Sequence, residues 1–201
     1  MSVHIYVEGG GDQSRTLTEC RRGFRLFFEK IVPTGSRPRV IACGSRKAAF
    51  EDFRAAIRHA GAGNSLLLVD SESPVNPRHG SWQHLKSVDG WTKPKNATDD
   101  EAHLMVQCME SWFLADVDSL AGYYQQGFAR NALPRNPQIE QAPKRDVARG
   151  LQSATRRTQK GEYHKTRQGF EILSRLDPAK VRERSPHAGR LCRVLTEKVT
   201  G

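Results

Sequence analysis

The sequence has few cysteines, no Cys-x-x-Cys pair and no long apolar run. The four cysteines are widely spaced at Cys20, Cys43, Cys108 and Cys192. This spacing argues against a zinc site, and a disulfide framework is not expected in a chain of 201 residues. We therefore expect four reduced and mostly buried thiols.

No stretch approaches the roughly 18 consecutive apolar residues of a membrane-spanning helix. The first residues also lack the basic segment of a secretory signal peptide, and the apolar run after them is short. We therefore expect a cytoplasmic protein without a membrane partner. Internal repeats and low-complexity segments are missing as well, which excludes repeat architectures.

The charge of the chain is unevenly distributed. Its net charge is +10, yet residues 1–128 hold 15 basic and 15 acidic side chains, whereas residues 129–201 hold 17 basic and 7 acidic ones. A neutral first part and a basic second part predict a polyanionic partner, which we expect to be nucleic acid. The alternative is a solvated basic surface without a specific partner.

Apolar patterning predicts strands that alternate with helices in the first part. We expect strands at 3–7, 39–43, 65–70 and 103–108, and helices at 15–32, 47–59 and 109–124. This order predicts an α/β fold with a Rossmann-like parallel sheet of about four strands, flanked by helices and joined by right-handed crossovers.

The remaining segments predict how the chain is divided. Residues 73–101 are polar and rich in Pro and Gly, which predicts a long loop with a short helix at 82–87. A Pro/Asn-rich linker at 127–143 precedes three predicted helices, at 144–157, 167–176 and 186–199. We predict an α/β core over residues 1–128 and a basic helical extension over residues 129–201 that packs on it.

Acidic residues follow three of the predicted strands. Glu8 ends the first strand and precedes three glycines and Asp12. A carboxylate there can bind a metal ion or act as a general acid or base, and the glycines allow close approach to a phosphate. The segment is neither a P-loop nor a dinucleotide-binding fingerprint. The alternative is a glycine-rich turn that Glu8 only caps.

Two further acidic groups follow later strands, Asp70 with Glu72 and then Glu110. The carboxyl ends of parallel strands meet at one edge, so we expect these groups and Glu8 to form a site for Mg²⁺ or Mn²⁺. Such an ion suits phosphodiester chemistry. The plainer alternatives are an exposed turn for Asp-x-Glu and a helix N-terminus for Glu110.

In this order of motifs the chain resembles the Toprim domain of topoisomerases, primases and overcoming-lysogenization-defect type nucleases. That family has a Glu after its first strand and an Asp-x-Asp after a later one, places taken here by Glu8 and by Asp70 with Glu72. Glu72 departs from the pattern but keeps its charge. The resemblance implies that Glu8 is a general acid/base or metal ligand, that Asp70 and Glu72 hold metal, and that Glu110 and Asp12 are additional carboxylates.

More closely, over roughly residues 3–195, the chain is similar to a small bacterial family of Toprim-like proteins. The segments that carry this similarity, besides the Glu8 motif, are 70–74, 109–114 and 163–165. Genes of that family often lie beside genes for AAA- or ABC-type ATPases in antiphage defence loci. The resemblance therefore implies an ATPase partner and a role in antiviral defence.

Basic residues of the second part are candidates for contacts with the substrate. We assign a catalytic role to Lys165, because a lysine near a carboxylate–metal site can stabilise charge on a phosphate. Five others are predicted to contact the nucleic-acid backbone, namely Arg156, Arg157, Lys160, Arg182 and Arg184. The alternative for all six is a solvated surface.

The function predicted from the sequence is a Mg²⁺-dependent endonuclease that acts on DNA or RNA. Two alternatives stay open, a non-catalytic subunit that binds nucleic acid or protein, and a phosphatase or nucleotidyl-transfer enzyme with a small substrate. The sequence also leaves open whether the chain forms a homodimer.

Overall fold

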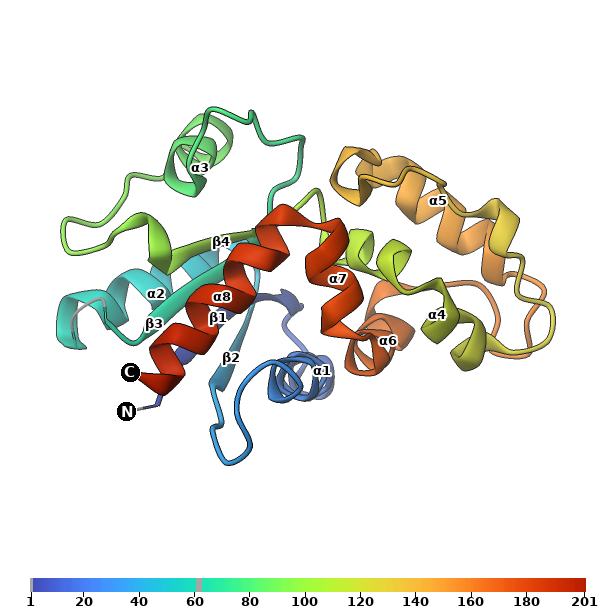
Figure 1. Ribbon diagram of the computed structural model, residues 1–201, viewed down its shortest axis with the longest axis horizontal. Helices are drawn as coiled ribbons and strands as arrows, with labels where there is room; N and C mark the ends of the chain where they lie inside the picture. Colours follow the sequence, from blue (N-terminus) through green and yellow to red (C-terminus); the bar gives the residue numbers. More distant parts are fainter. Residues whose placement is uncertain (1, 61–62) are drawn as a thin grey trace.

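The computed structural model describes residues 2–60 and 63–201 and shows an α/β fold around a parallel sheet (Figure 1). The strands are β1 His4–Gly10, β2 Arg39–Gly44, β3 Ser65–Asp70 and β4 Ala102–Met105. Within the described residues they lie in the order β2-β1-β3-β4, and each pairing is parallel. The predicted fold class is therefore confirmed.

The sheet is covered on both faces, as the continuous apolar run of β3 indicates. Alternate residues of a strand point to opposite faces. Leu66 and Leu68 of β3 belong to a hydrophobic cluster with α1 (Ser14–Glu29). Leu67 and Val69 belong to a second cluster with α2 (Arg46–Ala60) and α3 (Ser81–Asp89).

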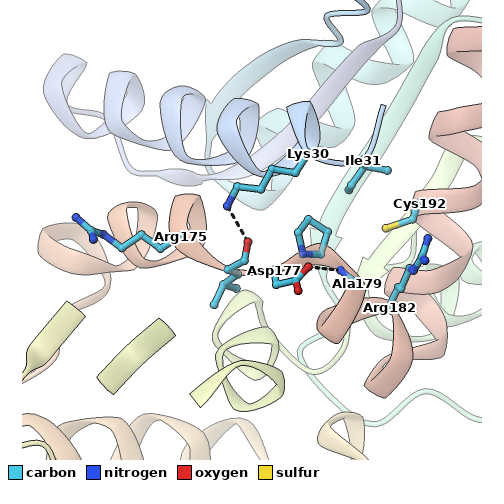
Figure 2. Close-up of a pocket in the computed structure, with 9 residues that line it drawn as sticks. Lys30, Ile31, Arg175, Asp177, Ala179, Arg182 and Cys192 are labelled. Atoms are coloured by element: carbon cyan, nitrogen blue, oxygen red, sulfur yellow. Dashed lines mark hydrogen bonds between the residues drawn. The ribbon is translucent and has the colours of Figure 1, made fainter. Parts of the chain in front are cut away.

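The C-terminal α-helices extend the hydrophobic cluster of α1, and the one at Phe170–Arg175 packs directly on α1. They are α5 Lys144–Thr155, α6 Phe170–Arg175, α7 Pro178–Arg184 and α8 Pro186–Thr200. The rings of Phe24 in α1 and Phe170 in α6 lie 6.4 Å apart. Lys30, just after α1, donates to the carbonyl oxygens of Ser174 at 2.7 Å and Leu176 at 2.8 Å. Figure 2 shows one of these two bonds as the dashed line from Lys30. The basic extension and the α/β core thus share one hydrophobic interior.

The segment 109–124 differs from the single helix that we predict. It forms a 3₁₀ helix at Met109–Ala115 and then α4 at Val117–Tyr124. Asp116 separates the two helices, because its side chain accepts a hydrogen bond from the Ser119 amide at 3.4 Å and so caps α4. A capping aspartate inside an apolar pattern therefore marked a helix start that periodicity alone missed.

Other helices and strands also differ from the predicted ones. The structure adds α7, which the sequence reading missed although Asp177 caps it and Pro178 begins it. A π-helix at Lys165–Gly169 precedes α6, and β4 ends at Met105 rather than at residue 108. In the described residues no helix has the length and apolar character needed to cross a membrane.

Candidate functional site

Three of the predicted carboxylates meet at the carboxyl edge of the sheet. Glu8, Asp70 and Glu72 each offer an oxygen, and these oxygens lie within 4.8 Å of one another. They meet because β1 and β3 are neighbours with Val7 opposite Leu68, so both strands end at the same edge. Carboxylate oxygens at such spacing suit a hard divalent cation. We call this group the carboxylate cluster.

The glycines after Glu8 are required by close backbone approaches. Gly10 has a φ of 91°, and a Cβ there would lie 3.0 Å from the carbonyl oxygen of Thr16 in α1. Gly44, at the end of β2, has a φ of 75°, and its Cβ would lie 2.6 Å from the carbonyl oxygen of Gly11. Only glycine fits both positions without strain, and the loop can therefore turn sharply from β1 into α1.

Asp70 is the buried centre of the site, with 1% of its surface exposed. Its Oδ1 accepts a hydrogen bond from the Met109 amide at 2.7 Å, and its Oδ2 lies 3.2 Å from Lys165 Nζ. Burial raises the pKa of Asp70 to about 6, and the charges of Glu8 and Glu110 add to this against the opposing effect of Lys165. A buried carboxylate in this position is stabilised by added positive charge.

Glu72 lies in an unusual backbone conformation. Its φ of 64° is in the left-handed region, which costs a non-glycine residue about 1 kcal/mol or more. The conformation is held because the Glu72 amide donates to the carbonyl oxygen of Gln107 at 3.0 Å, and that of Ser71 to Met105 at 2.9 Å. These bonds continue the pairing of β3 with β4 and keep Glu72 beside Asp70.

Lys165 lies between Asp70 and a fourth carboxylate. Its Nζ is 3.2 Å from Asp70 Oδ2 and 3.5 Å from Glu110 Oε2. Although burial favours the neutral amine, the charges of Asp70 and Glu110 raise the pKa of Lys165 above its ordinary value. The hydroxyl of Tyr163 donates to Glu110 Oε1 at 3.0 Å. Glu110 therefore adjoins the carboxylate cluster through Lys165 but is not one of its three members.

Arg46, which the sequence reading missed, orients Glu8. Its Nη1 lies 3.3 Å from Glu8 Oε2 and also donates to the carbonyl oxygen of Asp70. Its Nε and Nη2 bind both oxygens of Asp89 at 2.8 and 2.7 Å. Arg46 thereby connects the carboxylate cluster to α3, in the segment that we predicted to be mainly a loop.

Lys144, which is also not among the site residues predicted from the sequence, neutralises Glu72. Its Nζ lies 2.8 and 2.7 Å from the two oxygens of Glu72 and 3.9 Å from Asp70 Oδ2. Lys144 begins α5 just as Arg46 begins α2, where the helix dipole disfavours a cation. A basic residue at a helix start is thus the sequence signal that could have identified both.

The other predicted site residues lie outside this group. Asp12 is exposed in the loop before α1 and is not part of the carboxylate cluster. Arg156, Arg157 and Lys160 are exposed at the end of α5, with Lys160 Nζ 4.9 Å from the centre of the Tyr123 ring. Their proposed contacts with nucleic acid stay predictions.

Arg182 and Arg184, the other two basic residues predicted to bind nucleic acid, differ in how far their guanidinium groups are occupied within the fold. Arg182 is exposed and lines a hollow of about 350 Å³ that also holds Lys30 and Arg175 (Figure 2). Arg184 instead donates to three carbonyl oxygens, those of Leu114 at 2.5 Å, Asn136 at 2.9 Å and Pro137 at 3.3 Å. Arg182 is therefore available to a phosphate, whereas most of the Arg184 guanidinium is occupied within the fold.

Comparison with known proteins relates the chain to one family. Neither the curated proteins nor the solved structures gave a match. A family model described as a domain of unknown function (DUF4276) matches residues 7–196, a span that includes every member of the carboxylate cluster and both lysines beside it. The chain belongs to the DUF4276 family.

Proposed function

We propose that this protein is a metal-dependent nuclease that hydrolyses phosphodiester bonds of DNA or RNA at the carboxylate cluster. The observation that carries the proposal is the approach of Glu8, Asp70 and Glu72 oxygens within 4.8 Å, with Lys144 and Lys165 beside them. Carboxylates that could hold an ion and ammonium groups that could hold a phosphate thus occupy one edge of the sheet.

The residues present fit a hard divalent ion. Glu8, Asp70 and Glu72 would hold Mg²⁺ or Mn²⁺, since all three offer oxygen, the donor that these ions prefer. Burial, with the charges of Glu8 and Glu110, raises the pKa of Asp70, and the charge of a bound ion would favour its ionised form. A bound ion would supply Lewis acidity toward the phosphate and toward a water molecule.

Glu8 has a free oxygen for proton transfer or ion binding. Both of its hydrogen bonds, from Arg46 and from the Asp70 amide, go to Oε2. Among the described residues no partner is found for Oε1. The Glu8 carboxylate is therefore oriented through one oxygen, and we assign to the other the role of general base or ion ligand.

The charge balance of the site explains why a metal ion would favour substrate binding. The carboxylates are Glu8, Asp70, Glu72, Glu110 and Asp89, the last through Arg46, and the cations that contact them are Arg46, Lys144 and Lys165. This excess of negative charge opposes the binding of a phosphate. A divalent ion would cancel the excess, after which the two lysines can donate to phosphate oxygens.

The wider biological role follows from the Toprim-like resemblance. We propose that the protein is the nuclease subunit of a cytoplasmic antiphage system and that it acts with an AAA- or ABC-type ATPase. The exposed basic residues Arg156, Arg157, Lys160 and Arg182 would contact the nucleic-acid backbone.

A cleavage assay tests this function. Single- and double-stranded DNA and RNA are incubated with the purified chain, alone and with the cognate ATPase, in Mg²⁺, Mn²⁺ or chelator. We expect metal-dependent cleavage that Asp70→Asn and Glu8→Gln each reduce by about 10²–10⁴-fold, the size of a lost catalytic group. Asp12→Asn is the matched control, because Asp12 lies outside the cluster. Cleavage that survives in both cluster variants would overturn the assignment.

A non-catalytic nucleic-acid-binding subunit is the second candidate. The observation in its favour is that Arg46, Lys144 and Lys165 already pair with the carboxylates, so the network can hold loops together without a metal ion. Salt-sensitive nucleic-acid binding without cleavage under any of these conditions would select this function.

A further inference from the structure

A cleft of about 880 Å³ is lined in part by the chain that follows Glu72 of the carboxylate cluster. Its lining begins at Pro74, two residues after Glu72, and includes Gln141, three residues before Lys144. Since a chain spans at most about 3.6 Å per residue, the Cα atoms of Pro74 and Glu72 are no more than about 7 Å apart. The volume lies in the range typical of small-ligand sites, about 300–1,000 Å³.

Hydrogen bonds hold the walls of the cleft to the site. Gln107, next to the lining residue Val106, accepts from the Glu72 amide at 3.0 Å and from the Lys144 amide at 3.3 Å. Its side-chain amide donates to the carbonyl oxygen of Glu140 at 3.3 Å. A group bound in the cleft would therefore have a defined position relative to the cluster.

His187 provides a fixed polar group in the cleft. Its Nδ1 lies 2.8 Å from Glu140 Oε2, while Glu140 Oε1 accepts from the His187 amide at 3.0 Å and from the Ser185 hydroxyl. Within the described part of the chain, His187 Nε2 has no partner. With Nδ1 donating to a carboxylate, Nε2 is left to bind a ligand, as an acceptor in the neutral ring or as a donor in the imidazolium.

The rest of the lining is mostly flat and apolar. Apart from Glu140, Glu183 and Arg184, it consists of prolines, valines and two glutamines, namely Pro74, Val75, Pro77, Val106, Pro137, Pro186, Gln138 and Gln141. Apolar side chains can cover the faces of a planar heterocycle, and amide groups can bind its donor and acceptor edge. This composition suits a nucleobase.

A phosphate does not suit the cleft. Glu140 and Glu183 line it, and the Arg184 guanidinium is bonded to backbone carbonyl oxygens. An anion would meet two carboxylates without a free guanidinium to balance them. An uncharged ring with N–H and C=O groups meets no such cost.

We propose that this cleft binds one nucleobase of the substrate, next to the phosphate at the carboxylate cluster. The inference rests on the proposed function, because it takes the substrate to be a nucleic acid. It makes the enzyme a reader of one base beside the cleaved bond, with His187 as a specificity-determining residue.

Abasic scanning tests the proposal. A fluorescent single-stranded octamer, as DNA and as RNA, is bound in Mg²⁺ to the full chain carrying Asp70→Asn, which limits cleavage, and each nucleotide is replaced in turn by an abasic one. We expect one position at which the abasic change weakens binding about 5- to 10-fold, as lost stacking and one hydrogen bond predict. The other positions should change affinity about twofold or less.

His187→Asn links that loss to the cleft. Asparagine can keep the hydrogen bond to Glu140 while it removes the position of Nε2, so the variant should fold with an unchanged melting temperature. It should weaken binding of the intact octamer about fivefold and show no further loss at the sensitive position. His79→Ala, at an exposed histidine outside the cleft, is the matched control and should match the wild type.

The outcomes separate this proposal from the proposed function. If cleavage depends on Asp70 but every abasic position binds alike, the base site is refuted and the nuclease stands. If one position depends on His187 but no cleavage occurs, the base site stands and the nuclease is refuted. Amide NMR signals of Val75 and Val106 that respond to a peptide of the ATPase and not to nucleosides would also overturn the base site.

Discussion

The two parts of the chain supply different charges to one site, the first all of its carboxylates together with Arg46 and the second two lysines. Residues 1–128 contribute its carboxylates, Glu8, Asp70, Glu72 and Glu110. Residues 129–201 contribute Lys144 and Lys165, and also Tyr163, which donates to Glu110. The first part is neutral in sequence and the second strongly basic, yet at the site the two sets of charges largely compensate each other.

This comparison changes the meaning of the charge asymmetry. The excess of basic residues in the second part predicts a surface for a polyanion, but two of these lysines instead neutralise carboxylates, namely buried Asp70 and Glu110 and exposed Glu72. The second part is therefore a component of the site rather than an accessory to it. Removing the second part, or substituting single charged residues, should therefore change the stability of the fold and its affinity for metal ions. The expected effects follow from the largest to the smallest.

The largest effect should come from separating the parts. A chain that ends at residue 128 loses Phe170, which covers Phe24, and exposes much of the cluster around α1. We expect no cooperative unfolding transition for residues 1–128 in urea, because too little apolar surface stays buried. The full chain, measured in parallel by circular dichroism, should unfold cooperatively. A sharp transition in the shorter chain would show that the core folds alone.

Lys165→Met should be the most destabilising of the single substitutions. It leaves Asp70 and Glu110 without their shared cation, a change that costs about 3–5 kcal/mol at a fully buried site. Since 36% of the Lys165 side chain is exposed, solvent should reduce this to about 2–3 kcal/mol.

Urea unfolding measures this loss, and added Mg²⁺ should recover part of it if the carboxylates bind the ion. Lys95→Met, at an exposed lysine, should change the free energy of unfolding by about 0.5 kcal/mol or less. Equal effects of the two substitutions would argue against the role of Lys165 as a counter-ion.

The free energy of unfolding should depend on pH through His103, which lies where α8 meets β4. Burial, together with the charge of Arg190, lowers the pKa of His103 to about 3. The unfolded chain therefore binds this proton first, and stability should fall as the pH drops below about 6.5. Between pH 7 and pH 5 the loss from His103 is about 1–2 kcal/mol.

His103→Gln should reduce this loss, because glutamine can keep a donor toward the carbonyl oxygen of Asp100 without titrating. Urea unfolding of both proteins at pH 7 and pH 5 gives the comparison. Identical pH dependence in the two proteins would mean that the imidazole is not buried in its neutral form.

The smallest effect should be on metal affinity, through Lys144→Ala. The ammonium of Lys144 lies against Glu72 and opposes a cation bound there. Removing a partly exposed positive charge about 4 Å from a bound ion should make the free energy of ion binding about 1 kcal/mol more favourable. Mn²⁺ should therefore bind roughly fivefold more tightly. Calorimetric titration measures this directly. Arg145→Ala, at an exposed neighbour, should leave the affinity unchanged, and weaker Mn²⁺ binding by Lys144→Ala would contradict the argument.

Much of the fold could be predicted from local pattern. The apolar runs of β1 and β3 and the periodic apolar face of α1 identified their elements, because a buried strand and an amphipathic helix differ in period. The apolar pattern does not show where α4 and α7 begin. Their capping residues Asp116 and Asp177 mark these starts, so a prediction from the pattern merges α4 with the preceding helix and misses α7.

By itself the sequence determined the parallel sheet and the positions of Glu8, Asp70 and Glu72 at strand ends, since alternation of strands and helices dictates a common edge. The tertiary structure alone decided which charges meet there. Lys144 is 72 residues from Glu72 and Lys165 is 95 from Asp70, and no local period relates such distant residues. Packing of α6 on α1 and of α5 on the 3₁₀ helix at Met109–Ala115 brings them together, because burying that shared apolar surface determines where the lysines lie.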